Sequence, residues 1–395
     1  MTTTRFGRAP GKFAWTRALA AVVAAALTLT ACSSAPSESG AGAGARQEVT
    51  DVLGRTVTIP APATRILLDG GRLLYTMALL DKTDPLAGVV GMPDDLGQND
   101  PDTLKQYEKR FPDIARIPRT GQVYDGSFSV EAALKLDPDV FVISAANYQI
   151  AVDAGIVKTL DEAGIPTVVV DYFVDPLKNT LPSVRLMGKV LGRAAEAEAF
   201  AKQYQSTVDL VSSRLKKAAE PPTPALLWRA PGYFDCCSSF AKSNLGQLVT
   251  FAGGENIADD ILTTKQGTIS PEAVIRKNPQ VVIATGADWA PGTPAKPGSF
   301  IPLGYDESPA NAQQQLAALV AKQTGFDSIA AVRAHRVYAV WHHFYDSPYN
   351  YLAIAWFAKW LHPDLFADLD PTAMIRQLHS DFLPVPYAGT FWTSL

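Results

Sequence analysis

Short apolar runs alternate with helix-like stretches along most of the chain from residue 49 onward. Runs of four or five apolar and β-branched residues predict strands, and the sequence between most of them has helical character. The predicted strands are residues 65–68, 87–90, 140–144, 167–170, 225–228, 281–284 and 336–340. Strands that alternate with helices indicate parallel sheets with right-handed crossovers, so we expect an α/β protein.

Three further patterns frame this series of strands. Residues 49–59, with Gly54 and Arg55 at their middle, predict a β-hairpin. Residues 349–361 and 372–382 have the apolar spacing of helices and follow the last predicted strand.

Residues 182–220 carry no strand pattern and predict one long helix. They are rich in Ala, Glu, Lys and Leu, and their larger apolar residues recur at roughly helical spacing. Pro182 suits the first turn of a helix, where its missing N–H would lack a partner in any case. Gly188 or Gly192 would allow a kink, and Pro221 with the following Pro ends the helix. One stiff helix between two α/β halves restrains their hinge motion.

One passage of the chain occurs twice. The sequence FSVEAALKLDPDVFVIS at residues 128–144 aligns without a gap with ISPEAVIRKNPQVVIAT at residues 269–285, and both copies predict a short helix, a turn and an apolar strand. Ser129, Glu131, Ala132, Pro138 and Val140 recur as Ser270, Glu272, Ala273, Pro279 and Val281. Solenoid repeats recur every ~20–50 residues. Because this passage recurs only once and at a wider spacing, it indicates two similarly built lobes.

The first residues have the layout of an export signal. A basic region precedes an apolar run at residues 18–31, and small residues precede Cys32. The run is shorter than the ~20 residues that span a bilayer, so a retained membrane helix is the weaker alternative. The sequence Leu-Thr-Ala-Cys at residues 29–32 resembles a bacterial lipobox, which implies cleavage before Cys32 and lipidation of its thiol. Residues 33–47 are mostly Ser, Ala, Gly and Pro and predict a flexible tether.

Length and composition narrow the class of protein. A single hydrophobic core usually stops growing at ~250–300 residues. The 395-residue chain exceeds this length even without the predicted signal and tether, so we expect two domains. The 35 basic and 39 acidic residues nearly balance, and no basic run suggests a nucleic-acid partner. Apart from Cys32, the only Cys residues are the neighbours Cys236 and Cys237. The chain therefore has too few Cys residues for a fold that is held together by several disulfides. We expect two free or partly buried thiols there, because a bridge between neighbours closes a strained ring.

Together, the lipobox, the two α/β lobes and the linking helix resemble the substrate-binding lipoproteins of ABC importers for metal chelates, a family that serves ferric siderophores, haem and cobalamin. The resemblance covers about residues 49–392 and also rests on the sequence AGGENI at residues 252–257 and on the repeated Glu. It implies two lobes with mainly parallel sheets joined by one long helix. The implied divisions are a signal peptide (1–31), a lipidated Cys with its tether (32–48), an N-terminal lobe (49–181), a linking helix (182–220) and a C-terminal lobe (221–395).

The resemblance also implies a function. The protein would be a non-enzymatic receptor, exported and held as a lipoprotein on the outer face of the cytoplasmic membrane or in the periplasm. It would bind a metal chelate and deliver it to an ABC permease dimer with ATPase subunits. A ferric siderophore is the first choice of cargo, haem or cobalamin the second, and a simpler metal or oxyanion the third. We expect a monomer whose cargo is an iron chelate, with no cofactor of its own and no nucleic-acid partner.

The family's docking residues map onto the repeat. Glu131 and Glu272 would dock onto Arg residues of the two permease subunits, because a two-subunit permease presents each Arg twice. Helix capping is the alternative, since a carboxylate near the start of a helix gains from the helix dipole.

Candidate ligand-binding residues follow the predicted strands, because open α/β sheets bind ligands beyond the carboxyl ends of their strands. The candidates are aromatic or cationic: Arg72, Tyr148, Tyr172, Arg229, Tyr233, Trp289, His343 and Tyr345. Such groups suit a flat or anionic chelate better than a sugar. Arg72 and Arg229 offer planar donors to carboxylates, catecholates or an oxyanion, with a surface salt bridge as the alternative. The aromatic residues could instead pack within a lobe.

His343 is also the candidate metal ligand. Imidazole binds transition metals, and a protein His can complete an unsaturated ferric chelate. Consecutive residues of an extended segment point to opposite sides, so only one of His342 and His343 can face the cleft. We choose His343 because it lies nearer Tyr345 in the sequence, with a structural role as the alternative.

A cell-surface metal-dependent hydrolase is the alternative from a different class. Such an enzyme would need a Ser-His-Asp arrangement or a compact cluster of His and carboxylates, and neither stands out at a recognisable spacing. A visible absorption band in protein purified from its own host would favour the iron or haem carrier.

Overall fold

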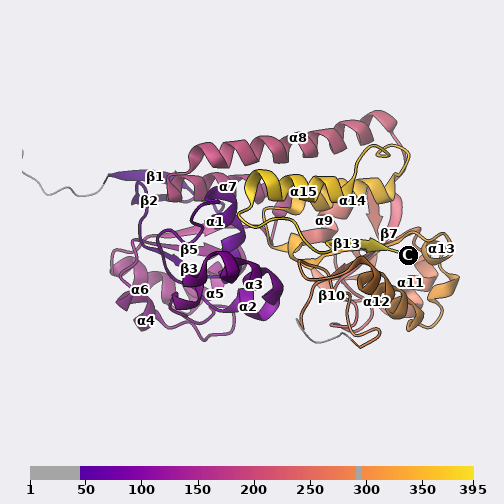
Figure 1. Ribbon diagram of the computed structural model, residues 1–395, viewed down its shortest axis with the longest axis horizontal. Coiled ribbons are helices and arrows are strands. Elements are labelled where there is room, and N and C mark those ends of the chain that lie inside the picture. The colour runs from indigo at the N-terminus through magenta and orange to yellow at the C-terminus, as the bar shows by residue number, and fades with distance from the viewer. Residues whose placement is uncertain (1–44, 291–295) are drawn as a thin grey trace, which may run out of the picture. The chain divides into compact units, whose positions relative to one another are not determined.

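Two parallel sheets organise the computed structural model, which describes residues 45–290 and 296–395 (Figure 1). The predicted signal peptide, Cys32 and the tether up to residue 44 lie outside the described residues. The first strand, β1 (Arg46–Thr50), pairs antiparallel with β2 (Thr56–Pro60), which confirms the predicted hairpin and extends it three residues toward the N-terminus. Within the described part of the chain, no helix is both long and apolar enough to cross a membrane.

The N-terminal lobe is built on a four-stranded sheet in which every pairing is parallel. Its order is β4 (Val89–Gly91), β3 (Ile66–Leu68), β5 (Val140–Ser144) and β6 (Thr167–Val170). The surrounding helices are α1 (Leu74–Leu80), α2 (Asp95–Asn99), α3 (Pro101–Arg110), α4 (Val130–Lys135), α5 (Ala145–Asp153) and α6 (Ile156–Glu162), with short 3₁₀ helices η1 (Gly71–Leu73) and η2 (Pro112–Arg116). Strands β3, β5 and β6 are almost wholly buried, as expected for a sheet covered on both faces.

The C-terminal lobe repeats this plan with five strands. Their order is β13 (Trp392–Ser394), β12 (Val337–Trp341), β11 (Val281–Gly286), β7 (Thr223–Trp228) and β9 (Gly254–Asn256), and only β13 is antiparallel. The helices are α9 (Asn244–Phe251), α10 (Ala258–Ile261), α11 (Pro271–Lys277), α12 (Pro309–Ala321), α13 (Ala330–Arg333), α14 (Asn350–Leu361) and α15 (Pro371–Phe382), with η3 (Phe326–Ser328) and η4 (His342–Tyr345). A separate antiparallel pair joins β8 (Ser238–Phe240) to β10 (Gln266–Thr268).

Two helices stand where one was predicted to link the lobes. Helix α7 (Pro176–Leu191) begins six residues earlier than predicted, and Pro182 lies inside it rather than in its first turn. This position is tolerated because Pro182 is on the exposed face, where water can satisfy the carbonyl that it leaves without a partner. The chain breaks at Gly192, in the left-handed conformation, and α8 (Ala194–Ala218) then continues to the C-terminal lobe. The break is at one of the two predicted glycines.

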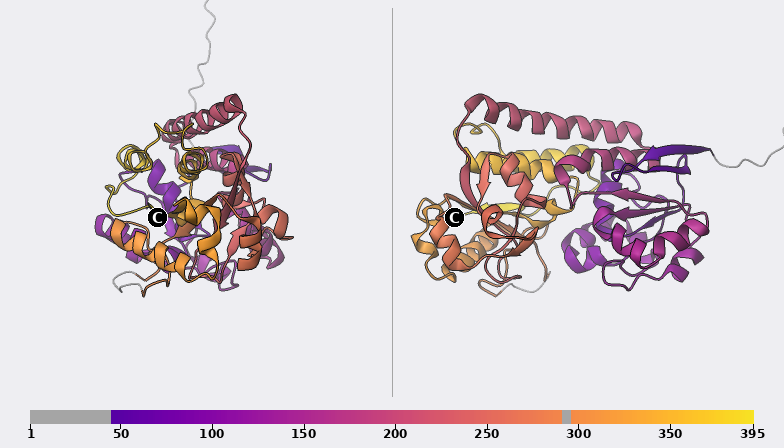
Figure 2. Two further views of the ribbon diagram at one scale, coloured as in Figure 1. Left: turned by 90° about the vertical axis from the view of Figure 1, so that its right-hand side faces the viewer. Right: turned by 180° about the vertical axis from the view of Figure 1, so that it is seen from behind.

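Helix α8 belongs to a helical layer and is not an isolated connection. Figures 1 and 2 show α8 on the same side of both sheets, with α14 and α15 beneath it. Phe200 of α8 contacts Tyr351 of α14 and Phe382 of α15, with ring centroids 5.7 and 5.4 Å apart. Asn350 of α14 donates to Thr180 Oγ1 of α7 at 2.8 Å. The lobes are therefore joined by a packed layer, which resists hinge motion more than one helix would.

The repeated passage forms the same structure in both lobes. The first copy is α4 followed by β5, and the second is α11 followed by β11. Ser129 and Ser270 cap the two helices, each accepting through Oγ from the backbone N–H three residues later. A residue with positive φ follows each helix at the matching position of the repeat: Asp137, two residues after α4, and Asn278, directly after α11. The duplication therefore extends to both ends of the helix.

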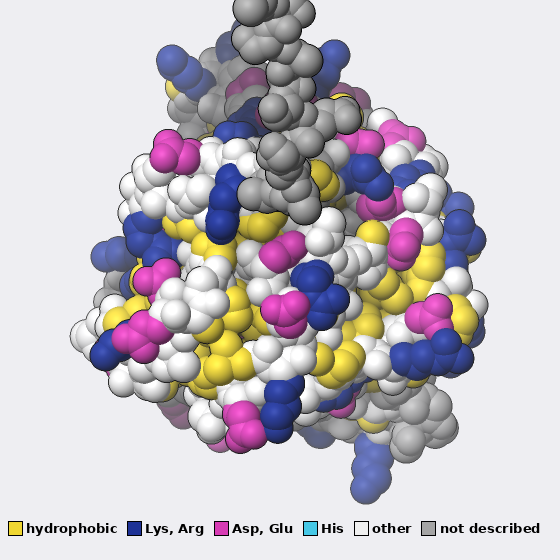
Figure 3. All heavy atoms as spheres, turned by 90° about the vertical axis from the view of Figure 1, so that its left-hand side faces the viewer, with side chains coloured by type: hydrophobic (Ala, Val, Ile, Leu, Met, Phe, Trp, Pro, Cys, Tyr) yellow, Lys and Arg dark blue, Asp and Glu magenta, His cyan; other side chains and the backbone are white. Residues whose placement is uncertain are grey.

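The surface at the end of the N-terminal lobe carries both signs of charge. In Figure 3, Lys and Arg side chains lie among Asp and Glu side chains, with small apolar areas between them. Neither sign forms a stripe on this face. The pattern agrees with the near balance of 35 basic and 39 acidic residues in the sequence.

Candidate functional site

A cleft of about 290 Å³ lies between the carboxyl ends of strands from both lobes. Strands β3, β5 and β6 end at it from the N-terminal lobe, and Arg229 follows β7 from the C-terminal lobe. The residues that line it are Asp69, Gly70, Arg72, Leu73, Asp95, Gln122, Tyr124, Ser144, Ala146, Asn147, Val170, Tyr172, Phe173, Arg229, Gln266, Tyr345 and Asp346. Four of the eight predicted ligand-binding residues are among them: Arg72, Tyr172, Arg229 and Tyr345.

Arg72 joins the two lobes across this cleft. Its Nε donates to Asp95 Oδ2 of its own lobe at 2.8 Å. Its Nη1 donates to the Tyr345 hydroxyl and to Asp346 Oδ2, both in the C-terminal lobe. Burial disfavours the charge on Arg72, but Asp346, Tyr345 and Asp95 together raise its pKa well above the usual value. Nε and Nη1 of Arg72 are therefore both held by protein groups.

Arg229 has a different environment. Its guanidinium carbon lies 4.2 Å from the ring centroid of Phe234 and 5.1 Å from that of Phe240. No described residue forms an ion pair with it, and its buried Nε lacks a hydrogen-bond partner among the described residues. Burial lowers its pKa, which means that the surroundings disfavour its charge. A desolvated cation without a counter-charge is a binding group for an anion.

Aromatic rings connect the two arginines. The guanidinium of Arg72 lies 5.8 Å from the Tyr345 ring, which contacts Phe173 edge-on at 5.6 Å. Phe173 in turn contacts Phe240, the ring that flanks Arg229, at 6.2 Å. Asn244 holds two of these aromatic residues in place, because it donates to the carbonyls of Phe173 and Tyr345, each at 2.8 Å. These two hydrogen bonds also connect the two lobes.

Three predicted aromatic residues do not line the cleft. Tyr148 accepts a hydrogen bond from Arg55 Nη1 at 2.6 Å, with its ring under the guanidinium of that residue. Tyr233 is 57% exposed and lies 4.8 Å from the ring of Trp289. Tyr233, in the loop that begins at Arg229, thus pairs with Trp289 on the C-terminal lobe, whereas Tyr148 packs within the N-terminal lobe.

His343 is also absent from the cleft lining. It is buried, its Nε2 lies 3.0 Å from the carbonyl oxygen of Asn99, and its Nδ1 lies 3.6 Å from Asp346. His342 is buried as well, with Nδ1 2.8 Å from Thr285 Oγ1. The alternation rule behind the choice of His343 fails because both residues belong to the 3₁₀ helix η4, not to an extended segment. Among the residues described, no three His, Cys, Asp or Glu side chains are placed to hold one metal ion.

Several lining residues were not singled out from the sequence. Asp95 and Asp346 hold Arg72, Gln122 and Tyr124 extend from the loop before α4, and Gln266 begins β10. Gln122 and Tyr124 immediately precede the repeated passage, so their position was the one available signal. Asp95 and Asp346 follow strands β4 and β12 as Arg72 follows β3, so the rule of strand ends could also have found them. Gln266 carries no such signal, because it belongs to the short strand β10, which forms by pairing with β8.

Cys236 and Cys237 form a disulfide, which corrects the prediction of two thiols. The bridge lies in the loop between β7 and β8, which begins at Arg229. Cys237 is wholly buried and Cys236 is partly exposed. A disulfide is expected in a compartment where thiols are oxidised.

The fold and this cleft define a class: a two-lobed binding protein of the metal-chelate type. The periplasmic binding protein family model matches residues 78–341, more than half of the chain, and the chain belongs to this family. Proteins of the family bind solutes outside the cytoplasmic membrane and work with the permease and ATPase components of ABC transporters. The predicted recognition and fold class are therefore confirmed.

Three known proteins show how close the likeness is. The TroA-like periplasmic binding protein FepB from Veillonella parvula has 29% sequence identity and a TM-score of 0.80, covering 88% of this chain and 99% of that one. An uncharacterized ABC transporter substrate-binding lipoprotein from Bacillus subtilis, YvrC, is 21% identical over 81% of this chain and 88% of its own length. The molybdate-binding protein MolA of Haemophilus influenzae is 22% identical over 86% of this chain and 91% of its own length.

Proposed function

We propose that this protein captures an anionic metal chelate, with a ferric siderophore as the first choice, and delivers it to an ABC permease. The observation that carries the proposal is Arg229, whose partly buried guanidinium is flanked by two aromatic rings and has no carboxylate partner among the described residues. Tyr172 and Phe173 line the same cleft, which suits a ligand that is both negatively charged and aromatic. Haem, cobalamin and a simple oxyanion are the alternatives.

The size of the cleft bears on the cargo. About 290 Å³ is near the lower end of the ~300–1,000 Å³ range of small-molecule sites. A larger chelate must extend beyond the mouth or separate the lobes at the Arg72 link. Tyr124, which is 53% exposed at the rim, could then contact the part that extends outward.

A thermal-shift panel tests the cargo. The probes are a trianionic ferric tris-catecholate, a neutral ferric tris-hydroxamate, haemin, cobalamin and molybdate. A ligand at ~100 times its dissociation constant adds ~2.7 kcal/mol to the stability of the native state. We expect the largest shift with the tris-catecholate and none with the neutral tris-hydroxamate. A shift with molybdate alone would identify an oxyanion carrier, and no shift with any iron complex would contradict the proposal.

Delivery to the permease is proposed to use Glu131 and Glu272. Both lie exposed in the first turns of α4 and α11, one in each lobe, and both helices are below α8 in Figure 1. Lys135 lies 2.8 Å from Glu131 as an exposed ion pair. The helix-start amide and the Ser270 hydroxyl lower the pKa of Glu272, so capping remains the alternative role for that residue.

Reconstituted transport with saturating cargo separates docking from capping. Changing both Glu131 and Glu272 to Arg should abolish most uptake, because like charges would oppose each other across the interface, while cargo affinity stays unchanged. The control is Glu108→Arg, which reverses a charge on α3 instead. Normal uptake by the double variant would leave the two residues as helix caps.

The membrane anchor is proposed to be a lipid on Cys32, on the support of the lipobox-like sequence at residues 29–32. Cys32→Ser removes the thiol that would be lipidated. The variant should lose incorporation of labelled fatty acid and appear in the soluble extracytoplasmic fraction. Unchanged labelling would contradict the assignment.

A further inference from the structure

The loop that begins at Arg229 is secured at both ends. Arg229 N–H donates to the carbonyl of Ser238 at 2.7 Å, which closes the loop where β7 ends and β8 begins. At the start, Ala230 N–H donates to Thr285 Oγ1 at 2.9 Å, and Ala230 has a positive φ of 42°. Residues 231–236, between these points, form local turns, such as the bond from Phe234 N–H to the Ala230 carbonyl at 3.0 Å.

The contacts of Arg229 depend on the shape of this loop. Phe234, at the loop's middle, supplies the nearer of the two rings against the guanidinium. Tyr233, the preceding residue, contacts both Phe234 at 5.0 Å and Trp289 at 4.8 Å. A change in the second half of the loop would therefore move Phe234 and alter the surroundings of the charge.

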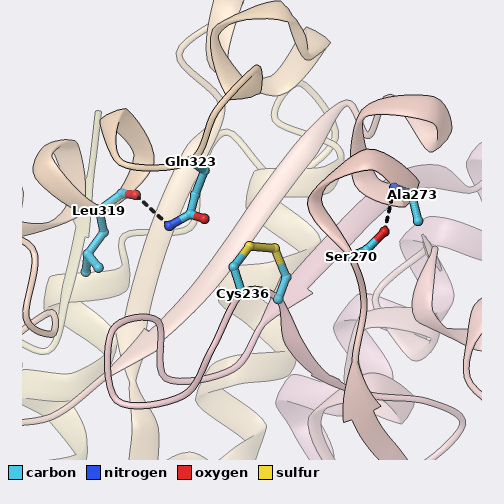
Figure 4. The surroundings of a disulfide bond; sticks show 6 residues. Cys236, Ser270, Ala273, Leu319 and Gln323 are labelled. Carbon is cyan, nitrogen blue, oxygen red and sulfur yellow. Dashed lines mark hydrogen bonds between the residues drawn. A yellow bond between two sulfur atoms is a disulfide. The ribbon is translucent and has the colours of Figure 1, made fainter.

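The disulfide lies in that second half. Cys237 pairs with Ile269 in both directions: its N–H donates to the Ile269 carbonyl at 2.5 Å, and Ile269 N–H donates back at 2.9 Å. Figure 4 shows the bridge with Leu319 and Gln323 on one side and the Ser270–Ala273 hydrogen bond of α11 on the other. The bridge thus lies where the Arg229 loop joins the rest of the lobe.

We propose that the Cys236–Cys237 disulfide positions Arg229 for anion recognition by restricting the loop that carries Phe234. The inference rests on the proposed function, because it assigns Arg229 to the cargo. A covalent ring removes loop conformations before the ligand arrives, so less ordering is needed on binding. Cys236 and Cys237 are therefore positioning residues that act through Arg229 without contacting the cargo.

Hydrogen–deuterium exchange of the ligand-free protein tests the positioning without any cargo. In the Cys236→Ser, Cys237→Ser variant, amides of residues 229–238 should exchange faster, whereas those of β11 should not change. Gln323→Ala, which alters the neighbouring segment and leaves the loop intact, is the control and should exchange like the wild type. Unchanged exchange in residues 229–238 would overturn the proposal whatever the cargo is.

Affinity for the ferric tris-catecholate tests the link to Arg229. Coupled residues typically interact strongly enough to change an equilibrium about tenfold, so the double Ser variant should bind about tenfold more weakly. In an Arg229→Gln background, removing the disulfide should change affinity less than about twofold, because the group that it positions is gone. Equal losses in both backgrounds would overturn the proposal and leave the proposed function intact.

Reduction of the wild-type protein provides a second arm if the Ser variant folds poorly. A water-soluble phosphine takes the oxygen of one water molecule to become its oxide, and its two electrons with the two protons of that water convert the disulfide to two thiols. The reduced protein should reproduce the faster exchange and weaker binding of the double Ser variant, and reoxidation should restore the wild-type exchange and affinity.

The untreated protein separates this proposal from the proposed function. If it does not bind the tris-catecholate, the proposed cargo is wrong, and the exchange measurement alone decides the positioning.

Discussion

Arg72 and Arg229 make the most instructive comparison between the two lobes. Each follows the first parallel strand of its lobe and lines the same cleft. Arg72 contacts two carboxylates and a tyrosine hydroxyl, whereas Arg229 lies against two phenylalanine rings and has no carboxylate partner among the described residues. The same side chain at the same kind of position therefore holds the lobes together in one case and is left available to a ligand in the other.

The largest expected effect comes from removing the paired arginine. Arg72→Ala would leave Asp95 and Asp346, whose side chains are 4% and 11% exposed, without their cation. Removing one partner of a buried pair costs about 3–5 kcal/mol, and we expect a loss near the lower value because the cleft admits water. Urea denaturation measures the free energy of unfolding.

The control for Arg72 is an exposed pair. Arg116 and Asp113 lie 2.7 Å apart, with side chains 84% and 73% exposed. Exposed pairs contribute about 0–1 kcal/mol, so Arg116→Ala should scarcely change the free energy of unfolding. Similar losses in the two variants would show that the link across the cleft does not stabilise the protein.

Removing Arg229 should lower the affinity for the ligand and not the free energy of unfolding, the opposite of the result expected for Arg72. Arg229→Ala should weaken binding of the ferric tris-catecholate at least tenfold, because a charge-assisted hydrogen bond contributes about 1.5–3 kcal/mol. The free energy of unfolding should stay the same or rise, since a desolvated cation without a partner is unfavourable. Calorimetric titration and urea denaturation give the two quantities.

A conservative variant refines the Arg229 experiment. Arg229→Lys keeps the charge but loses the planar group that lies against Phe234 and Phe240. Its affinity should fall between those of the wild type and Arg229→Ala. Wild-type affinity in Arg229→Ala would place the anion elsewhere in the cleft.

A smaller effect is expected when Arg72 is made to resemble Arg229. Asp346→Asn removes the carboxylate of the opposite lobe, while Asp95 still holds Nε of Arg72. The Asn amide oxygen can still accept from Nη1, so the variant loses the charge of this contact and not the hydrogen bond itself. The free energy of unfolding should therefore fall by less than the about 1.5–3 kcal/mol of a charge-assisted hydrogen bond. Affinity for the trianionic probe should rise, because a negative charge leaves the cleft and the charge of Arg72 is less neutralised. Weaker binding would mean that the link must be intact for the site to form.

Strong local patterns explain how much of the fold was predicted. Strands β5 and β6 have the predicted bounds, and β3, β4, β7, β11 and β12 lie within two residues of theirs. Long apolar runs between breakers leave little choice of conformation. The missed strands β8, β9, β10 and β13 have three residues each, and pairing with distant segments creates them. Their sequences carry no signal of that pairing.

The candidate site was also predictable only in part, because contacts between distant segments leave no signal in the local sequence. The rule of strand ends pointed to Arg72, Tyr172, Arg229 and Tyr345, and these four residues line the cleft, because strand direction is a local property. Which groups each contacts is not local: Asp346 is 274 residues from Arg72. The opposite roles of the two arginines therefore could not be read from the sequence.

The last prediction concerns pH and Asp69, a buried carboxyl group at the cleft. It accepts from Ser144 N–H at 3.0 Å and Asn147 Nδ2 at 2.9 Å, but burial outweighs these bonds and raises its pKa from 3.8 to about 6. Between these two values the folded state binds more protons than the unfolded chain. The stability from this group is thus fully present below pH 3.8 and is lost as the pH rises through about 6.

Asp69→Asn isolates this contribution, because the amide does not titrate and can still accept the two hydrogen bonds. The variant's free energy of unfolding, minus that of the wild type, should rise between pH 4 and pH 7 and level off above that range. Urea denaturation in a series of buffers of constant ionic strength measures this difference. A difference that stays constant with pH would mean that Asp69 titrates normally despite its burial.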